Sequence, residues 1–252
     1  MDFYHYVKPR EFEQVLRSKL LQDLRSKVRA HFRDADILSF GSFPAGLYLP
    51  TSDMDIVMVS DKFMRGGNAK YDNRGAIYKF DAFLQKNNIA IQGSIEKIIG
   101  AKVPLVKWVD RVTGLKVDLS FENDTGLTAI KTFLDWKTQF PAMPILVTLI
   151  KQFLTMRGLN EPVNGGIGGF SMTCLVVSLL QAMPQVQSRS MVPEHHLGEI
   201  LMEFFDLYGN EFNTVTTAIA FNPPGYIPKV SIHPLLLSNA NPVIVSQPQS
   251  SL

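Results

Sequence analysis

The first half of the chain mixes apolar residues at helical spacing with short apolar runs typical of strands. Apolar side chains recur every fourth position across residues 9–33, which predicts one amphipathic helix whose interspersed basic residues, Arg17 among them, face solvent. Apolar runs rich in β-branched residues predict strands at residues 37–40, 53–59, 95–99, 104–109 and 115–121. A short helical stretch after Gly41 and Ser42 and a helix over residues 77–87 complete a mixed α/β half.

The pattern changes to helical spacing near residues 123–126. Apolar residues recur at that spacing over residues 128–140, 145–157, 171–183 and 197–208, with proline or glycine between the segments, so we expect a mostly helical second half. The most apolar stretches are shorter than a membrane span, and one contains Lys151, which predicts buried helices of a soluble protein. Residues 230–252 carry no Asp, Glu, Lys or Arg and predict a poorly ordered tail.

Composition and charge narrow the class of protein. The 252 residues are 46% hydrophobic, which excludes a wholly disordered chain, and the single cysteine, Cys174, excludes a disulfide framework and a cysteine-rich zinc module. The 25 Lys and Arg residues nearly balance the 23 Asp and Glu residues, which gives a net charge of +2. This balance argues against a protein that holds nucleic acid mainly through a positive field. The charged first residues do not predict a secretory signal.

Two carboxylates interrupt one of the apolar predicted strands. Asp53 and Asp55 are two residues apart, so on a strand their side chains point to the same face and repel each other. Mg²⁺ would neutralise them, because it binds one or two carboxylates and completes its coordination with water and phosphate. Asp118 lies on another predicted strand, and if the two strands pair, three carboxylates could hold two metal ions for nucleotidyl transfer. Gly41 and Ser42 would offer N–H groups and a hydroxyl to a phosphate.

Each part of this pattern also has an ordinary explanation. An Asp-x-Asp pair is usually a solvated turn, and Gly-Ser before a helix is usually a helix cap. Here the carboxylates lie within an apolar strand, where unpaired charge is costly to bury, and this favours metal binding. No cysteine or acidic cluster joins His195 and His196 at ligand spacing, so they predict a helix start. The glycine-rich segment at residues 165–169 lacks a following Gly-Lys-Ser/Thr and predicts a flexible connection.

The combination of a Gly-Ser pair, an Asp-x-Asp pair ten residues later and a third carboxylate resembles the DNA polymerase β-like nucleotidyltransferase superfamily. Within it, the chain is most similar to the noncanonical nuclear poly(A) polymerases, the TRAMP-type or DNA polymerase sigma family. The similarity runs from the first residues to about residue 213 and is carried by the segments FGSFPAGLYLPTSDMDIVMV, VPLVKWVDRVTGLKVDLSF, PILVTLIKQFLTMRGLNEPVNGGIGGFSM and LMEFFDLYGNEFN.

The resemblance implies an α+β fold in two parts. A nucleotidyltransferase palm-like mixed-sheet domain would occupy residues 19–124. A mostly helical central domain, of the type called PAP-associated, would comprise residues 1–18 and 125–229, with residues 230–252 as the tail. In this family the helical domain closes over the nucleotide that the palm-like domain binds.

The resemblance also implies a role for each matched residue. Asp53 and Asp55 would bind both Mg²⁺ ions, and Asp118 would bind the catalytic ion and help to activate the attacking 3′-hydroxyl. The other matched positions would bind the nucleotide: Gly41, Ser42 and Lys151 the triphosphate, Gly126 the sugar and Phe170 the base, while Gly169 falls where the family often has a phosphate-binding serine. On spacing alone, a lysine extending from an apolar helix face explains Lys151 about as well as triphosphate binding does. On spacing alone, Phe170 is first interpreted as a core residue.

The implied function is the template-independent addition of AMP from ATP to the 3′ end of RNA in nuclear RNA surveillance. Pyrophosphate would be released, and Mg²⁺, or Mn²⁺ in its place, would be the metal cofactor. Family members work with a zinc-knuckle RNA-binding protein and an exosome-associated helicase, so the expected partners are these and the RNA 3′ end, with no membrane. An RNA-binding partner would also explain the balanced charge.

Alternative functions remain open at the level of sequence. The family's second half continues past residue 213 into a nucleotide-recognition loop that ends in Asn-Asp, and residues 214–252 contain no Asn-Asp pair. Base selection is therefore undetermined, and a terminal uridylyltransferase of the same superfamily is the first alternative. A catalytically impaired scaffold that binds partners is the second. Small-molecule nucleotidylation shares the carboxylate motif but does not explain the similarity of the helical half.

Overall fold

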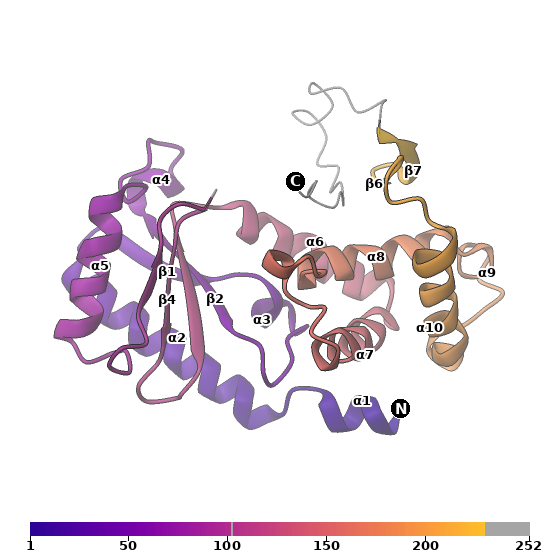
Figure 1. Cartoon of the computed structure of the whole chain (residues 1–252), viewed down its shortest axis with the longest axis horizontal. Helices are drawn as coiled ribbons and strands as arrows, with labels where there is room; N and C mark the ends of the chain where they lie inside the picture. The colour runs from indigo at the N-terminus through magenta and orange to yellow at the C-terminus, as the bar shows by residue number, and fades with distance from the viewer. Residues whose placement is uncertain (102, 230–252) are drawn as a thin grey trace. The chain divides into compact units, whose positions relative to one another are not determined.

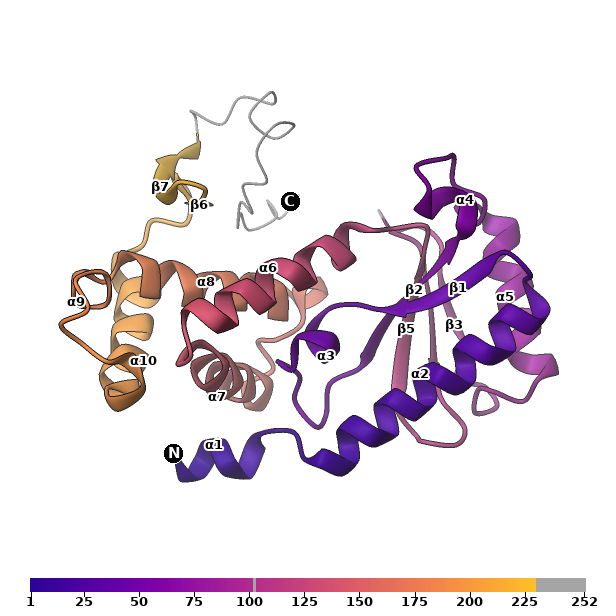
Figure 2. The same cartoon turned by 180° about the vertical axis from the view of Figure 1, so that it is seen from behind.

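The computed structural model describes residues 1–101 and 103–229. Within these residues a mixed β-sheet with packed helices is followed by a mostly helical region, which confirms the predicted α+β fold class (Figures 1 and 2). No helix in this part of the chain is both long enough and apolar enough to span a membrane. The tail predicted at residues 230–252 lies outside the described residues.

The chain divides into two compact units, which we call the sheet unit and the helical unit. Among the described residues, the sheet unit comprises Asp2 and residues 4–134, and the helical unit comprises Met1, Phe3 and residues 135–229. The two units are compact by packing and are not defined by activity. The catalytic and helical domain limits inferred from the sequence therefore stay a prediction.

The sheet unit contains a five-stranded mixed sheet in the order β1-β2-β5-β4-β3. The strands are β1 (Ala35–Ser39), β2 (Met54–Ser60), β3 (Glu96–Ile98), β4 (Leu105–Val109) and β5 (Lys116–Phe121). β2 runs parallel to β5, and every other neighbouring pair in this sheet is antiparallel. All five predicted strands are confirmed to within two residues at each end, because each is a short apolar run bounded by turn residues.

Two long helices, α2 (Glu11–His31) and α5 (Arg74–Lys86), pack on the same face of this sheet (Figures 1 and 2). Side chains alternate between the faces of a strand, so β2 contributes Met54, Ile56 and Met58 to the apolar core under these helices. Asp55 lies between Met54 and Ile56 in the sequence and therefore points to the opposite face. The shorter helices of the first 134 residues are α1 (Asp2–Val7), α3 (Ser42–Ala45) and α4 (Asp61–Met64).

The structure confirms the first long helix but corrects its buried face. Arg17 is buried together with Leu20, Leu24 and Val28, whereas Leu16 is 36% exposed, so the expectation that Arg17 faces solvent is wrong. A spacing of four residues drifts around a helix that turns about 100° per residue. Arg17 lies within about 20° of the direction shared by the three buried apolar residues, and Leu16 lies about 80° away from it.

The helical unit is built around α7 (Met143–Met156) and α8 (Gly169–Ala182), which pack against each other. Both were predicted, as were α6 (Thr125–Gln139), whose first residues belong to the sheet unit, and α10 (Leu197–Asp206). Residues Met172 to Leu180 of α8 are all buried, which explains the nearly continuous apolar sequence of this helix. The remaining short helices are η1 (Pro162–Asn164), α9 (Pro184–Gln187), η2 (Pro193–His195) and the π-helical turn η3 (Leu207–Glu211).

A hairpin in the helical unit contradicts the predicted pattern. Strands β6 (Thr217–Phe221) and β7 (Pro224–Pro228) form an antiparallel hairpin, although the sequence pattern indicated only helices in this half. β7 contains a proline at each end, and proline argues against a strand unless the strand lies at an edge. A two-stranded hairpin gives both of its strands an edge, so these prolines are tolerated. Ala218 and Ile219 of β6 are buried.

Candidate active site

Asp55 and Asp118 lie next to each other across the parallel strands β2 and β5. Their Cα atoms are partners in the register of this pair, which places the third predicted carboxylate beside the Asp-x-Asp motif. Lys107 of β4 is the register partner of Asp118 on its other side, so the three residues form a row across adjacent strands. Since the neighbouring apolar residues of each strand face the core, this row lies on the face away from α2 and α5.

Lys107 forms an ion pair with the third carboxylate. Its Nζ donates a hydrogen bond to Oδ2 of Asp118 at 2.5 Å, and the two side chains are 35% and 17% exposed. Burial lowers the pKa of Lys107, but the hydrogen bond to Asp118 and the negative charges of Asp118 and Asp53 outweigh it, so the pKa lies above its usual value. Asp53, which directly precedes β2, therefore belongs to the same electrostatic group.

The Gly41 backbone packs directly against the Asp55 carboxylate. The ladder between β1 and β2 continues for one residue, because the N–H of Phe40 donates to the carbonyl of Asp55 at 3.0 Å. Gly41 then turns with a φ of +70°, and a Cβ at this position would lie 2.6 Å from Oδ2 of Asp55. Only glycine allows both the positive φ and this approach. Ser42 follows Gly41 as the first residue of α3, and its contact with a triphosphate stays a prediction.

Gly126 is placed near the same turn by the packing of α6. A Cβ at Gly126 would lie 2.4 Å from Cδ2 of Phe40, the residue before Gly41. The absence of a side chain lets the first turn of α6 approach the Phe40 ring. The structure thus explains the glycine by packing, and its contact with a nucleotide sugar stays a prediction.

The other predicted nucleotide-binding residues gather in the helical unit. A Cβ at Gly169, the first residue of α8, would lie 2.9 Å from Cε and 3.2 Å from Nζ of Lys151 on α7. Phe170 follows Gly169 and is 43% exposed, so its interpretation as a core residue is wrong. The amine of Lys151 therefore lies beside the first turn of α8, next to an exposed aromatic residue.

Two charged residues near the carboxylates were missed by the sequence analysis. Lys107 interrupts the apolar strand Leu105–Val109 as Asp55 interrupts β2, and this was the available signal. Its partner depends on the pairing of β4 with β5, which spacing alone does not give. Arg17 is the other missed charged residue, and it is only 1% exposed.

The remaining candidates have structural roles. His196 is the residue before α10, and its Nδ1 lies 3.1 Å from Oε2 of Glu199, so the predicted helix start is confirmed. The glycine-rich segment connects η1 to α8, and Gly165 has a φ of +81° there. Neither feature contributes to the row of charged residues on the sheet.

The carboxylates fit a hard divalent cation that shares its coordination with substrate. The described residues contain no group of three His, Cys, Asp or Glu side chains arranged to enclose a metal ion by themselves, and Asp118 is turned toward Lys107. Mg²⁺ commonly binds through one or two carboxylates and takes water and phosphate oxygens for the rest. Asp55 and Asp118, with Asp53 nearby, supply ligands of this type and not the nitrogen and sulfur ligands of a structural zinc site.

A glycine turn packed on one carboxylate, with a second carboxylate on the next parallel strand, defines the palm of a nucleotidyltransferase. The sequence model of the family "Poly(A) RNA polymerase, mitochondrial-like, central palm domain" matches residues 1–134. The model of the "Cid1 family poly A polymerase" matches residues 196–250. This match extends past residue 213, where the sequence similarity was expected to end. The chain belongs to this family of noncanonical poly(A) polymerases, whose fold implies a nucleotide substrate and a divalent metal ion.

Individual relatives agree with this family. The chain is 36% identical over 230 residues to Poly(A) RNA polymerase protein 2 of Saccharomyces cerevisiae, which covers 90% of this chain and 38% of that protein. It therefore spans less than two fifths of the length of this relative. A solved structure of the polymerase core of TRAMP, an RNA surveillance complex, superposes with a TM-score of 0.79 at 35% identity, covering 91% of this chain and 69% of the other.

One further relative concerns catalytic competence. The inactive noncanonical poly(A) RNA polymerase protein Trf4-2 of Drosophila melanogaster is 30% identical over 214 residues, which covers 84% of this chain and 50% of that protein. Similarity to this family therefore does not by itself decide activity, which depends on the residues of the site.

Proposed function

We propose that this chain transfers AMP from ATP to the 3′-hydroxyl of RNA without a template, as the polymerase part of a nuclear RNA surveillance enzyme. The observation that carries the proposal is the juxtaposition of Asp55 and Asp118, with Gly41 packed on the Asp55 carboxylate. The similarity to the TRAMP polymerase core supports the surveillance role and the nuclear location.

Each candidate site residue of the sheet unit would have a defined task in this reaction. The oxygen of the 3′-hydroxyl would form a bond to the α-phosphorus while the bond to the pyrophosphate oxygen breaks, pyrophosphate would leave, and the hydroxyl proton would pass by way of the Asp118 carboxylate to water. Asp118 would activate the hydroxyl, and the Gly41 backbone with the Ser42 hydroxyl would hold the triphosphate. Asp53, Asp55 and Asp118 would hold Mg²⁺, or Mn²⁺ in its place, which neutralises charge on the phosphates when bound.

The helical unit would bind the remainder of the nucleotide. The Lys151 amine beside the first turn of α8 would contact the triphosphate, because a cation and helix N–H groups both favour an anion. The exposed ring of Phe170 would stack on the base, and Gly126 of the sheet unit would lie against the sugar. Gly169 lacks the serine hydroxyl of many relatives, and the end of Lys151 lies next to the position that this side chain would take.

The proposed partners come from the family resemblance, and the charge of the chain is consistent with them. A net charge of +2 gives little electrostatic affinity for RNA, so a zinc-knuckle RNA-binding protein would supply the grip and an exosome-associated helicase would take the tailed RNA. The isolated chain should then bind RNA weakly, and binding should weaken further as salt is raised. Nanomolar RNA binding by the chain alone would contradict this assignment of roles.

An extension assay tests the proposed reaction. The purified chain is incubated with a labelled RNA oligonucleotide, ATP and Mg²⁺, and products are resolved by length. Asp55→Asn and Asp118→Asn should lower the rate by about 100-fold or more, because each removes a ligand charge from the site. Asp81→Asn is the matched control, since Asp81 is a buried carboxylate of the same unit that pairs with Lys97 instead. Wild-type rates for both site variants would refute the proposal.

The same assay separates the alternative functions. ATP and UTP compete in one reaction, and preferential uridine incorporation would identify a terminal uridylyltransferase. Two observations support the scaffold alternative: one relative is named as inactive, and Asp118 is paired with Lys107. It predicts no incorporation of any nucleotide and no metal-dependent ATP binding by calorimetry.

A further inference from the structure

Arg17 of α2 is a fully buried cation close to the candidate active site. The residue is 1% exposed, and its Nη2 donates hydrogen bonds to the carbonyl oxygens of Pro50 at 3.0 Å and Ser52 at 2.8 Å. Its guanidinium carbon also lies 4.8 Å from the centre of the Tyr48 ring. Within the described residues, Nε and Nη1 have no hydrogen-bond partner. A guanidinium buried with only part of its donors satisfied is unfavourable unless its position serves another purpose.

The two carbonyls belong to the loop that leads into Asp53. This loop connects α3 to β2, and Ser52 is joined to Asp53 by a single peptide bond. Within the loop, the N–H of Leu49 donates to Oγ of Ser52 at 3.0 Å. The hydroxyl of Tyr48 also donates to Oε1 of Gln14 on α2 at 3.1 Å, so α2 holds the loop at two points. Arg17 therefore determines where the chain enters the carboxylate motif.

Arg17 is also electrostatically coupled to the carboxylates, although its hydrogen bonds are made to the carbonyl oxygens of Pro50 and Ser52. Burial lowers its pKa, and the negative charges of Asp53 and Asp55 are among the influences that raise it again. A methionine or leucine would fill the same buried position on the helix without a desolvation penalty. A charged fork that binds two loop carbonyls at this buried position points to a role in the site.

We propose that Arg17 is a positioning residue that holds the loop at residues 49–52 so that Asp53 and Asp55 can bind the divalent cation. The inference rests on the proposed function, because the cation and its carboxylates are those of the nucleotidyl transfer site. Arg17 acts through the backbone of Pro50 and Ser52, in the manner of outer-shell residues that orient metal ligands. Its removal should weaken metal binding even though it removes a positive charge.

The sign of the change separates positioning from a pure charge effect. If Arg17 acted only as a nearby cation, its loss would strengthen the binding of Mn²⁺, because like charges repel. If it positions Asp53, its loss should weaken binding by about 10- to 100-fold, as found for outer-shell partners of metal ligands. A merely structural role would lower thermal stability and leave the dissociation constant of the folded protein unchanged.

The test uses Mn²⁺ as a spectroscopic probe. Binding of Mn²⁺ to the whole chain, in the presence of a non-hydrolysable ATP analogue, is followed by electron paramagnetic resonance for the wild type and Arg17→Met. We expect the dissociation constant to rise by about 10- to 100-fold. Tyr48→Phe keeps the loop packed and removes only the hydrogen bond to Gln14, so it should weaken binding in the same direction by up to about tenfold. This variant tests the inference if Arg17→Met does not fold.

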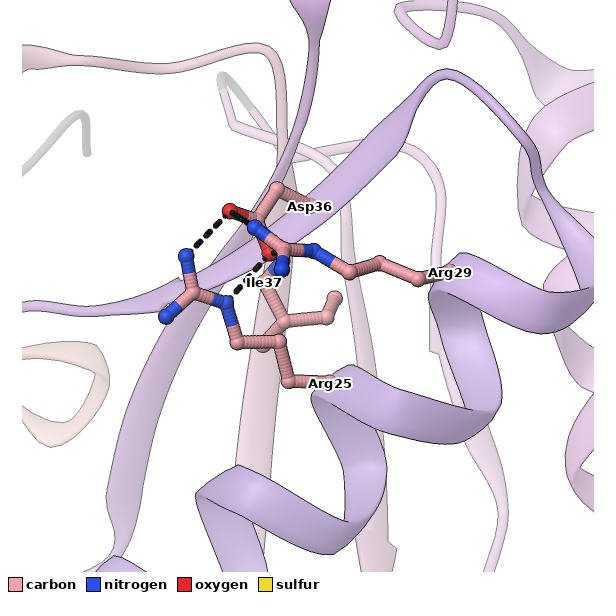
Figure 3. A network of polar contacts seen from close by, with 4 residues as sticks. All are labelled: Arg25, Arg29, Asp36 and Ile37. Carbon is pink, nitrogen blue, oxygen red and sulfur yellow. Dashed lines mark hydrogen bonds and ion pairs between the residues drawn. The ribbon is translucent and has the colours of Figure 1, made fainter.

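Arg25→Met is the matched control on the same helix. Arg25 and Arg29 both pair with Asp36 of β1 (Figure 3), with Nη2 to Oδ2 distances of 2.5 and 2.6 Å. Asp36 is the register partner of Val59, at the end of β2 opposite to Asp53. Losing the Arg25 guanidinium should lower stability without changing Mn²⁺ binding. Equal binding by wild type, Arg17→Met and Tyr48→Phe, or tighter binding by Arg17→Met, would overturn the inference and leave the proposed function standing. Absence of Mn²⁺ binding by the wild type would overturn both.

Discussion

Replacing Gly41 with alanine tests the close approach of the glycine turn to Asp55. The added Cβ would lie 2.6 Å from Oδ2 of Asp55, and ordinary contact begins at 3.4 Å, so the carboxylate and the turn must separate by 3.4 − 2.6 = 0.8 Å. A displacement of this size at a reacting group costs about 100-fold in rate. The backbone adds a second cost, since φ and ψ of +70° and −141° lie near a region used almost only by glycine, worth about 1–3 kcal/mol of stability.

The control for this prediction is Gly114→Ala. Gly114 has nearly the same φ, +71°, in the same unit, but nothing lies within 4 Å of the position that its Cβ would take. This variant should lose about 1–2 kcal/mol of unfolding free energy and keep the wild-type rate. Urea unfolding gives the stability, and primer extension corrected for the folded fraction gives the rate. A Gly41→Ala variant that extends RNA as fast as Gly114→Ala would refute the argument that this contact positions Asp55.

Three further predictions concern other charged and aromatic residues. Burial raises the pKa of Asp36, but hydrogen bonds from Arg25 and Arg29 outweigh it and hold the pKa below its usual value of 3.8. The ionised Asp36 therefore stabilises the fold above that pH, and this stabilisation is lost as the pH falls. Asp36→Asn should flatten the acid limb of a pH–stability curve measured by urea unfolding. Lys107→Met removes a cation that competes for Asp118 and should strengthen Mn²⁺ binding, and weaker binding would contradict this competition. Phe170→Ala should raise the KM for ATP by about 5- to 100-fold through loss of base stacking, whereas Phe170→Tyr should restore it; equal KM values would exclude stacking.

The sheet and the main helices were predictable because their apolar patterns are set by burial on one or two faces. β2 shows this best, since Ile56, Val57, Met58 and Val59 are all buried and give a continuous apolar run in the sequence. The β6–β7 hairpin was missed because its prolines and short strands give a weak local signal. Its formation depends on tertiary packing that no window of the sequence contains.

The candidate site was predictable in its acidic part and not in its basic part. Asp55 could be recognised because a carboxylate within an apolar strand is rare, and Asp118 because it follows the same pattern. Lys107 was not assigned a role because its partner depends on the order of strands in the sheet. Arg17 was assigned to the solvent face because basic and acidic residues are interspersed along this helix, and only the helical angle relative to Leu20, Leu24 and Val28 distinguishes it.

Lys107 and Arg17 explain how three carboxylates can lie close together on strands β2 and β5 and at the start of β2. Asp53, Asp55 and Asp118 carry three negative charges, whereas Lys107 pairs with Asp118 and Arg17 is coupled to Asp53 and Asp55 from within the fold. The protein therefore offsets most of the carboxylate repulsion with its own side chains. Folding should then not require the metal ion, in contrast to small domains that unfold without one. A chelator should leave the far-ultraviolet circular dichroism of the chain unchanged, and unfolding on chelation would show that the cations do not supply this balance.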